Sequence, residues 1–299
     1  MELRPKLPIG PNDLVLDVGS GDFPHPAASV LVDRYLDYKG ERHNSPLIRD
    51  RPLVVADVER LPFRDKTFDY AIASHVLEHT VQPLRAAAEL SRVARNGYVE
   101  TPSEIWEYFF GQEFHRHVVS LDAGQLVFKR KLNRSPFAEL WKALAEKEPL
   151  ITDIGDNHPE LMLVGLQWSG AIPCRLSEDP WPQSLEIASF VARLRPGRST
   201  LRQALRTLAR ATLPPATLAQ FHKQRDHFPL SMISRANVVS KWAPAKPGSQ
   251  SKPVDLTSLL ICPICKSGEL AWQEEEIKCS GCGGVYERQG GVPVMLAND

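Results

Sequence analysis

The sequence predicts an α/β fold, in which a mostly parallel sheet carries helices on both faces and is followed by a basic helical extension and a small four-cysteine module. Three observations predict this organisation. Short apolar runs alternate with helical stretches between residues 13 and 102, basic side chains gather between residues 193 and 252, and four of the five cysteines lie beyond residue 261. With 299 residues, 42% of them hydrophobic, the chain can bury a core without disulfide staples.

Apolar runs in the first part of the chain have the length of buried strands. They are LVLDV (14–18), VLVD (30–33), LVVAD (53–57), FDYAIAS (68–74) and GYVET (97–101). The stretch from Pro83 to Arg95 predicts a helix that Asn96-Gly97 ends, because small and apolar residues recur there at helical spacing: Leu84, Ala87, Ala88, Ser91 and Ala94. Strands that alternate with helices are typical of an open parallel sheet.

The middle of the chain predicts further elements. HVVSLDAGQLVFKRK (117–131) is typical of a hairpin, and a helix is expected from about Pro136 to Lys147. LMLVGLQWSGAIPCRL (161–176) offers two strands that could complete the sheet with an antiparallel edge. A helical pattern follows from Ser184 to about Phe228, and WAPAKPGSQSKPVD (242–255) has the composition of a linker. We therefore expect four segments: 1–183, 184–242, 243–255 and 256–299.

Charge is balanced only in the sum, with 36 basic and 36 acidic residues. Between Arg193 and Lys252, twelve lysines and arginines minus one acid, Asp226, give +11, so the rest of the chain carries −11. Such a segment suits a polyanion, whether RNA, an anionic membrane surface or a phosphorylated substrate. A solvated helix face explains the same pattern equally well.

The amino terminus, MELRPKLPIGPND, has neither the apolar core of a secretory signal nor the pattern of a transit peptide. No stretch approaches the roughly 20 apolar residues that a membrane-spanning helix needs. We therefore expect a cytoplasmic protein, in which paired cysteines indicate a metal site and not disulfides. Cys174 stands alone and is expected to be a small buried side chain.

The first motif, LVLDVGSGDFPHP (14–26), places Asp17 at the end of a buried strand and Gly19-Ser20-Gly21 in the turn after it. Glycines there let the backbone approach a ligand closely. A dinucleotide-binding turn would have a third glycine where this chain has Pro24, and Asp17 would repel a pyrophosphate. The turn therefore suits a cationic cofactor that lacks phosphates.

Two further acids follow apolar runs. Asp33 ends VLVD, where a carboxylate can accept hydrogen bonds from both hydroxyls of a ribose, and Asp57 follows the third run, where it can accept from an adenine amino group. Each is weak evidence by itself. Together with the glycine turn they indicate a nucleoside site along the edge of the sheet.

The segments LDVGSG, VLVD, ADVERLPFRDKTFDYAIASHVLEH and ELSRVARNGYVETP resemble the class I S-adenosylmethionine-dependent methyltransferases, over roughly residues 12–104. The resemblance implies a Rossmann-like fold and a cofactor site. Its residues would be Asp17, Gly19, Ser20 and Gly21 for the methionine end, Asp33 for the ribose, Asp57 and Val58 for the adenine, and Ser74 and His75 beneath the sulfonium. The absent third glycine and the short spacing to Asp33 depart from the family pattern.

Methyl transfer needs no nucleophilic side chain, because the sulfonium already activates the methyl carbon. A proton acceptor is required where the acceptor carries a proton. The main candidates near the strand ends are His79, His115 and Glu78, and the further candidates are His117 and Glu100. A structural role is an equal alternative for each. No Asn/Asp-Pro-Pro-aromatic tetrad follows the fourth run, which argues against methylation of amide nitrogen or adenine N6.

The segment from His75 to His79 also matches HxxEH, a zinc-protease spacing. Its position directly after FDYAIAS argues against a protease. A divalent ion at this turn, which some methyltransferases that this chain resembles hold, is a minor alternative.

The second motif consists of two CxxC pairs, Cys262 with Cys265 and Cys279 with Cys282. Four thiolates complete a tetrahedral zinc site and leave no open position, so the zinc would be structural. The stretch LLICPICKSGEL to GGVPVML (259–296) resembles the small zinc-ribbon activator subunit of RNA and release-factor methyltransferases and its short bacterial relatives. The resemblance implies a zinc ribbon that docks in cis on the methyltransferase domain.

Three functions are compatible with these residues. A methyltransferase acting on a small molecule or a glycan, including a lipid-linked intermediate, is favoured by the VLEH segment and by aromatic residues that could wall an acceptor pocket: Trp106, Tyr108, Phe109, Phe110 and Phe114. An RNA methyltransferase is favoured by the activator-like ribbon and the basic segment. A non-catalytic scaffold would have no use for the intact cofactor motif, and we expect the first of the three.

Overall fold

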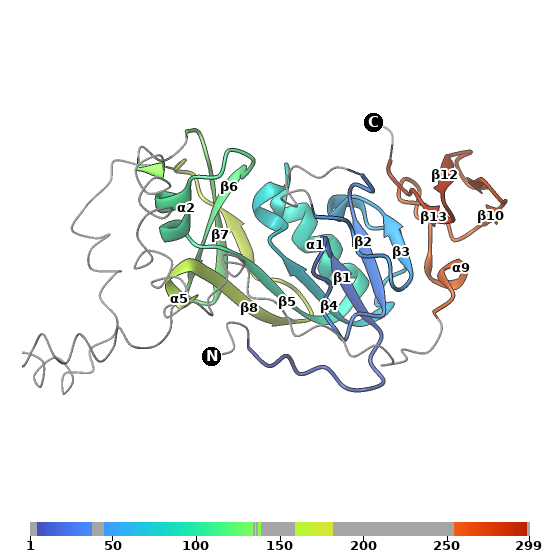
Figure 1. Ribbon diagram of the computed structural model, residues 1–299, viewed down its shortest axis with the longest axis horizontal. Coiled ribbons are helices and arrows are strands. Elements are labelled where there is room, and N and C mark those ends of the chain that lie inside the picture. Colours follow the sequence, from blue (N-terminus) through green and yellow to red (C-terminus); the bar gives the residue numbers. More distant parts are fainter. Residues whose placement is uncertain are drawn as a thin grey trace, which may run out of the picture. The chain divides into compact units, whose positions relative to one another are not determined.

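The computed structural model describes residues 5–37, 45–133, 135, 137–138, 159–181 and 254–297. The chain divides into two compact units, Met1–Gln183 with Ser240–Asp299, and Ser184–Val239. All described residues belong to the first unit (Figure 1). The basic helical extension therefore lies outside the described residues, as do most of the helix expected after Pro136 and most of the linker.

The main sheet has six strands in the order β3-β2-β1-β4-β5-β8 (Figure 1). Five are parallel, and β8 lies antiparallel on β5, which confirms the antiparallel edge expected from residues 161–176. The order of the sheet reverses between β1 and β4, so their carboxyl ends form a switch point of the kind where α/β sheets bind ligands. The strands are β1 Val15–Val18, β2 Val30–Asp33, β3 Leu53–Val55, β4 Phe68–Ser74, β5 Ala94–Pro102 and β8 Leu163–Ser169.

The central strands read as continuous apolar runs because both of their faces are buried. One face packs under helix α1 (Pro83–Val93). The expected helix face was wrong in part, because Leu84 and Ala88 are exposed and the buried residues lie one step round the helix: Pro83, Ala86, Ala87, Leu90 and Val93. Alanines and Leu90 let the helix lie close to the sheet.

The opposite face of the sheet carries a separate apolar cluster. Leu7 and Ile9 of the extended amino-terminal segment pack there against Val15, Tyr70 and Ile72. No residue of a described helix belongs to this cluster. Within the described residues, an extended segment thus takes the place that a helix has on the other face.

The end of α1 also differs from the expectation. The helix was expected to run to Arg95 and to end at Asn96-Gly97, but it ends at Val93, and β5 starts at once with Ala94. Gly97 lies inside β5, where a Cβ would overlap the backbone oxygen of Ala71 and the ring of Trp168. This glycine therefore serves close packing within the sheet and not a helix stop.

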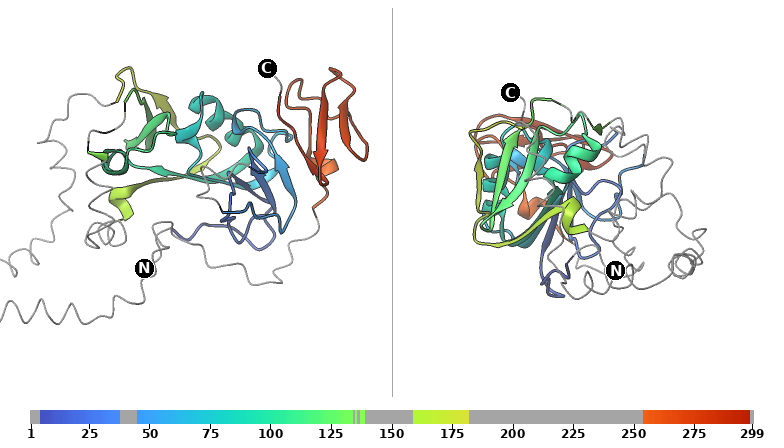
Figure 2. Two further views of the ribbon diagram at one scale, coloured as in Figure 1. Left: turned by 45° about the horizontal axis from the view of Figure 1, so that its top comes forward. Right: turned by 90° about the vertical axis from the view of Figure 1, so that its left-hand side faces the viewer.

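A second sheet of three strands has the order β6-β7-β9. The expected hairpin is confirmed as β6 (His117–Asp122) and β7 (Gln125–Arg130), turning at Ala123-Gly124 with positive φ at both positions. The strand β9 (Cys174–Leu176) pairs parallel with β7, so the second strand expected to extend the main sheet joins this one. Figure 2 shows the second sheet beside the carboxyl end of β5, where Ser103 bridges Val119.

Short helices complete the first part of the unit. They are the 3-10 turns η1 (Val58–Arg60) and η2 (Leu77–His79) and the helices α2 (Glu104–Phe110) and α5 (Pro159–Met162). Between β1 and β2 the described residues form turns and no helix, whereas the short spacing from Gly21 to Asp33 predicts a short helix there. No helix among the described residues is long and apolar enough to cross a membrane.

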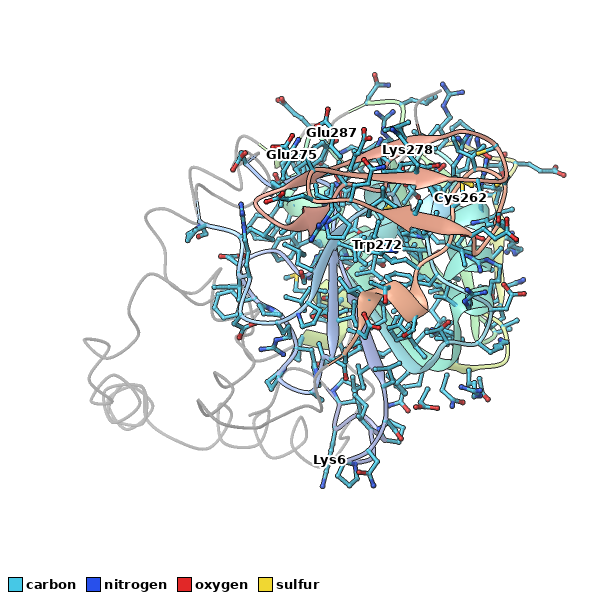
Figure 3. All side chains as sticks on the ribbon, turned by 90° about the vertical axis from the view of Figure 1, so that its right-hand side faces the viewer. Lys6, Cys262, Trp272, Glu275, Lys278 and Glu287 are labelled. Atoms are coloured by element: carbon cyan, nitrogen blue, oxygen red, sulfur yellow. The ribbon has the colours of Figure 1, made fainter. Side chains whose placement is uncertain are left out.

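The carboxy-terminal module spans residues 254–297 and holds a four-stranded antiparallel sheet in the order β10-β11-β12-β13. Charged side chains such as Lys278, Glu275 and Glu287 project from its outer face (Figure 3). Its elements are α9 Leu256–Leu259, β10 Leu270–Trp272, β11 Glu276–Cys279, β12 Val285–Gln289 and β13 Val292–Pro293.

Isolated β-bridges join the module to the first part of the unit at two places, among other contacts. Val294 forms a parallel bridge with Val55 of β3, and the amide of Met295 donates to the Val55 carbonyl at 2.7 Å. Leu260 forms an antiparallel bridge with Phe63, and both side chains are 0% exposed. Module residues therefore share one continuous core with the main sheet.

Candidate functional site

The turn after β1 forms one side of the candidate site. Gly19 and Gly21 have φ of +70° and +54°, a region that favours glycine. A Cβ at Gly19 would overlap Cγ2 of Val76, which follows β4. From the sequence, we expected this glycine to let a ligand approach the backbone. In the structure, it lets the turns after β1 and β4 lie against each other.

The polar groups of this turn are buried. Asp17 is 4% exposed, and its Oδ2 accepts a hydrogen bond from the backbone amide of His25 at 2.6 Å. Ser20 is also 4% exposed, and its hydroxyl has no hydrogen-bond partner in the described structure. Because a buried hydroxyl is seldom left unpaired, a polar ligand group fits at this position.

Asp33, at the end of β2, fixes the same turn. Its Oδ2 accepts from the amide of Gly21 at 3.1 Å, and its Oδ1 accepts from the amide of Tyr35 at 3.0 Å. A carboxylate oxygen can accept more than one hydrogen bond, which binding of ribose hydroxyls by Asp33 would require. The hydrogen bond between Gly21 and Asp33 is consistent with the short stretch of chain that separates them.

Asp57 and Val58 lie at the start of η1, after β3. Asp57 caps this turn by accepting from the amide of Glu59 at 2.9 Å, and its second oxygen pairs with Arg34 at 2.9 Å. Val58 is buried. Asp57 thus makes two contacts within the protein that the sequence did not indicate. They are additional to the adenine contact that we expected.

Ser74 and His75 lie at the carboxyl end of β4. His75 has φ of +56°, a strained conformation for a residue with a side chain. Its amide donates to the carbonyl of Glu100 at 2.8 Å, and the Ser74 hydroxyl donates to Glu100 Oε1 at 3.2 Å. Glu100 is 1% exposed and also accepts from the Tyr98 hydroxyl at 2.8 Å, so it holds the ends of β4 and β5 together.

Glu78, His79 and His115 come together, although His115 lies on a different segment. Their ligand-type atoms lie within 4.8 Å of one another. Glu78 is 1% exposed, and neither of its carboxylate oxygens has a hydrogen bond in the described structure. His75 Nδ1 lies 3.5 Å from its Oε1, and His79 Nε2 lies 3.8 Å from the same oxygen.

Burial raises the pKa of Glu78, but the neighbouring histidines outweigh burial and leave its pKa below the ordinary value. His75 contributes most among them, followed by His79 and His115. Glu78 is therefore an anion in a buried cluster of imidazoles. Such a group is a strong attractor of cations and of polar hydrogens.

A further acid supports His115. Glu107 of α2 is 2% exposed, and its Oε2 lies 2.7 Å from His115 Nδ1. Lys131 donates to the other oxygen of Glu107, so this carboxylate acts as an acceptor and His115 Nδ1 carries the hydrogen. We assign this tautomer from the hydrogen bond. It directs the lone pair of Nε2 away from Glu107.

Sequence reasoning missed Glu107, Lys131 and Arg34. The one available signal for Glu107 was its position in EIWEYFF, where an acid lies among aromatic residues of a helix and is expected to be buried with a partner. Phe114, among the aromatic candidates, stacks on His79 with ring centroids 5.4 Å apart and is 38% exposed. Tyr108 instead packs in the core against Trp181.

His117 lies outside the Glu78, His79 and His115 cluster. It is 8% exposed, and its ring faces the edge of Phe128. Burial lowers its pKa, which favours the neutral form. This packing fits a structural role for His117, which the sequence analysis gave as the alternative to a catalytic one.

The four cysteines of the module converge. Their sulfur atoms lie within 4.8 Å of one another, with Cys262 and Cys282 at 3.6 Å and Cys265 and Cys279 at 3.5 Å. Tyr286 places its hydroxyl 3.0 Å from Cys262 Sγ. Burial raises the pKa of Cys262, but this hydrogen bond and backbone amides outweigh it and bring the pKa to about 6. Four convergent sulfurs, one of them a ready thiolate, fit a zinc ion.

Comparison with known proteins gives matches to parts of the chain. Residues 31–99 match a family described as "Methyltransferase domain". A malonyl-[acyl-carrier protein] O-methyltransferase of Marinomonas is 30% identical over 38% of this chain and 48% of its own length. A demethylmenaquinone methyltransferase of Mycobacterium is 35% identical over 30% of this chain and 41% of its own length. The chain thus spans less than half the length of these relatives.

A shorter relative is matched over most of its length. A UPF0434 protein of Methylobacillus flagellatus is 44% identical over 46 residues, which are 15% of this chain and 75% of that protein. Among solved structures, an S-adenosylmethionine dependent methyltransferase from Mesorhizobium loti is 16% identical, with 54% of this chain and 94% of that chain covered at a TM-score of 0.29.

Proposed function

We propose that this chain is an S-adenosylmethionine-dependent methyltransferase. It belongs to the UPF0434 family over a 46-residue stretch, and residues 31–99 match a methyltransferase domain. Its acceptor is a small molecule or a glycan, including a lipid-linked intermediate. Its four cysteines hold a structural zinc. We assign the 46-residue stretch to the four-cysteine module, whose CPIC and GGVPVML segments carry the resemblance to the short bacterial zinc ribbons.

One observation carries the proposal. The glycine turn after β1, with the buried Asp17 and Ser20, and the strained His75 turn after β4 meet at the switch point of the sheet, where the close approach of Gly19 and Val76 joins them. Asp33 lies at the end of the next strand on one side. This arrangement supports one site for a nucleoside cofactor and its acceptor.

S-adenosylmethionine, when bound, supplies an electrophilic methyl carbon. The chain has to bind and orient both partners. We assign the methionine end to Asp17, Gly19, Ser20 and Gly21, the ribose to Asp33, the adenine to Asp57 and Val58, and the region beneath the sulfonium to Ser74 and His75. The buried, unpaired hydroxyl of Ser20 and the two left-handed glycines are the features that best fit this assignment.

We assign the acceptor side to Glu78, His79 and His115. The Nε2 lone pair of His115 can take a proton or bind an electrophile, because Nδ1 is already held by Glu107. Phe114 supplies a half-exposed aromatic surface beside His79. An acceptor with a hydroxyl and a flat or apolar body suits these groups.

Two relatives bear on the class of acceptor. The two methyltransferase relatives are named for an acyl-carrier-bound malonyl group and for a demethylmenaquinone, and neither name refers to RNA. The basic segment that favoured RNA lies outside the described residues. Among the described residues, the activator-like ribbon is the feature that favours RNA, which we therefore keep as an outcome of the test.

The module has a role in cis in this proposal. Val294 and Met295 pair with Val55, two residues before Asp57, and Lys266 donates to the Leu61 carbonyl after η1. These contacts support a module that stabilises β3 and the segment carrying Asp57 and Val58. Loss of its zinc would then weaken cofactor binding through β3.

The test is a methyl-transfer assay with labelled S-adenosylmethionine, using the zinc-replete full chain and panels of phenols, quinols, sugars, lipid-linked glycans and RNA. We expect label in a small-molecule or glycan acceptor, and no label with the Glu78→Gln variant. Label in RNA alone would move the proposal to RNA methylation. Cofactor binding without transfer to any panel would leave the non-catalytic scaffold.

A further inference from the structure

We propose that Glu78, His79 and His115 form a second metal site, separate from the four cysteines, that binds a divalent transition-metal ion. Two imidazoles and one carboxylate are a common ligand set for zinc, iron(II) and cobalt(II). Their donor atoms lie within 4.8 Å of one another. An ion with ligand bonds of about 2 Å draws such atoms closer still, which side-chain rotations can achieve.

The state of Glu78 is the first independent observation. Its carboxylate is 1% exposed, and both oxygens lack a hydrogen bond in the described structure. A buried carboxylate without hydrogen bonds is unfavourable unless a cation lies close. Nitrogens of His75 and His79 lie 3.5 and 3.8 Å from Oε1, distances that an ion with ligand bonds of about 2 Å can bridge.

The support of His115 is the second. Histidines that bind metals usually donate the other ring N–H to a carboxylate or carbonyl, which fixes the tautomer and directs the lone pair at the ion. His115 has this arrangement with Glu107 at 2.7 Å, and Lys131 pairs with Glu107 in turn. The amide of Arg116 donates to the Glu78 carbonyl at 2.8 Å, which ties the segment of His115 to η2.

The place of the site suggests its use. Three protein ligands leave at least one position open, in contrast to the four cysteines. Glu78 lies three residues after His75, which we place beneath the sulfonium, so the open position would take an oxygen of the acceptor. This use rests on the proposed function, whereas binding of the ion does not.

The test is a cobalt(II) titration of the full chain whose cysteines are already loaded with zinc. Cobalt bound by nitrogen and oxygen gives visible ligand-field bands without the thiolate charge-transfer bands of a cysteine site. We expect one cobalt ion per chain with bands of the first kind. Glu78→Gln should abolish this binding, and Glu107→Gln should weaken it about 10- to 100-fold.

Glu100→Gln is the matched control, because Glu100 is equally buried and lies 3.8 Å from His75 but outside the three-residue cluster. It should leave cobalt binding unchanged. His79→Asn is the second variant should Glu78→Gln fail to fold, since the His79 side chain is 22% exposed. Wild type that holds one zinc per chain and binds no cobalt overturns the inference, as does unchanged binding by the folded Glu78→Gln or His79→Asn variant.

S-adenosylmethionine binding is measured on the same samples. Cofactor binding without cobalt binding removes only the metal site. Cobalt binding without cofactor binding removes the methyltransferase proposal and keeps the metal site.

Discussion

At the scale of single residues, Gly19 shows how local geometry sets the site. Gly19→Ala would place a methyl group against Val76 at a φ of +70°. We expect a loss of about 1 to 3 kcal/mol in the free energy of unfolding from backbone strain, with a further loss from the overlap. S-adenosylmethionine binding should weaken at least tenfold. Urea denaturation and calorimetric titration measure the two effects.

Gly124→Ala is the matched control for this prediction. Gly124 has φ of +79°, but nothing lies within 4 Å of the position that a Cβ would take there. It should show the strain without the overlap and should leave cofactor binding intact. Equal effects of the two variants would contradict the role given to the contact between Gly19 and Val76.

The sequence predicted many of these residues from their order along the chain. Asp17, Gly19 and Asp33 follow buried runs, and the parallel sheet brings the ends of such runs to one edge. The sequence could not show that His115 joins Glu78, because that contact depends on how the segment after α2 folds back over η2. It could not show that Gly19 faces Val76 for the same reason.

At the scale of elements, Glu89 joins α1 to the module. It pairs with Arg92 on its own helix and with Lys266 of the module at 3.0 Å. Burial raises the pKa of Glu89, but hydrogen bonds from Arg92 and Lys266 outweigh burial and hold the pKa below its ordinary value. The ionised carboxylate is therefore bound more tightly in the folded state than in the unfolded state.

A pH dependence follows. Because the pKa is lowered on folding, the contribution of Glu89 to stability is complete above its ordinary value of about 4.5 and is lost as the pH falls through the lowered value. Glu89→Gln should reduce stability by about 1.5 to 3 kcal/mol at pH 7 and flatten this part of the acid profile. The exposed Glu275 supplies the control variant, Glu275→Gln, whose profile should match wild type. A steep loss retained in Glu89→Gln would contradict the assignment.

The elements also differ in how far their sequence predicts them. Strands β1 to β4 are short, apolar and buried on both faces, so their composition predicts them. The predicted end of α1 was wrong because Asn96-Gly97 is typical of a helix stop. In the structure, Gly97 lies in β5 and makes room for the ring of Trp168 on the neighbouring strand β8. Such a contact between distant segments leaves no local signal.

At the scale of the molecule, the module and the sheet share one core. Leu260 is 0% exposed and bridges Phe63, so Leu260→Ala should lower the free energy of unfolding by about 2 to 5 kcal/mol. Val285 on β12 is 49% exposed, and Val285→Ala should change the free energy of unfolding by at most about 0.5 kcal/mol. Thermal denaturation should show one transition that moves as a whole in Leu260→Ala. A separate module transition, with the remainder unchanged, would contradict a shared core.

The proposed function depends on binding of S-adenosylmethionine at the edge formed by β1, β2 and β4. Calorimetric titration of the zinc-replete chain tests it most directly, with Asp33→Asn as the variant and Asp37→Asn, whose side chain is 93% exposed, as the control. We predict one cofactor per chain in wild type and Asp37→Asn, and at least tenfold weaker binding in Asp33→Asn. A folded, zinc-loaded protein that binds no cofactor would contradict the account.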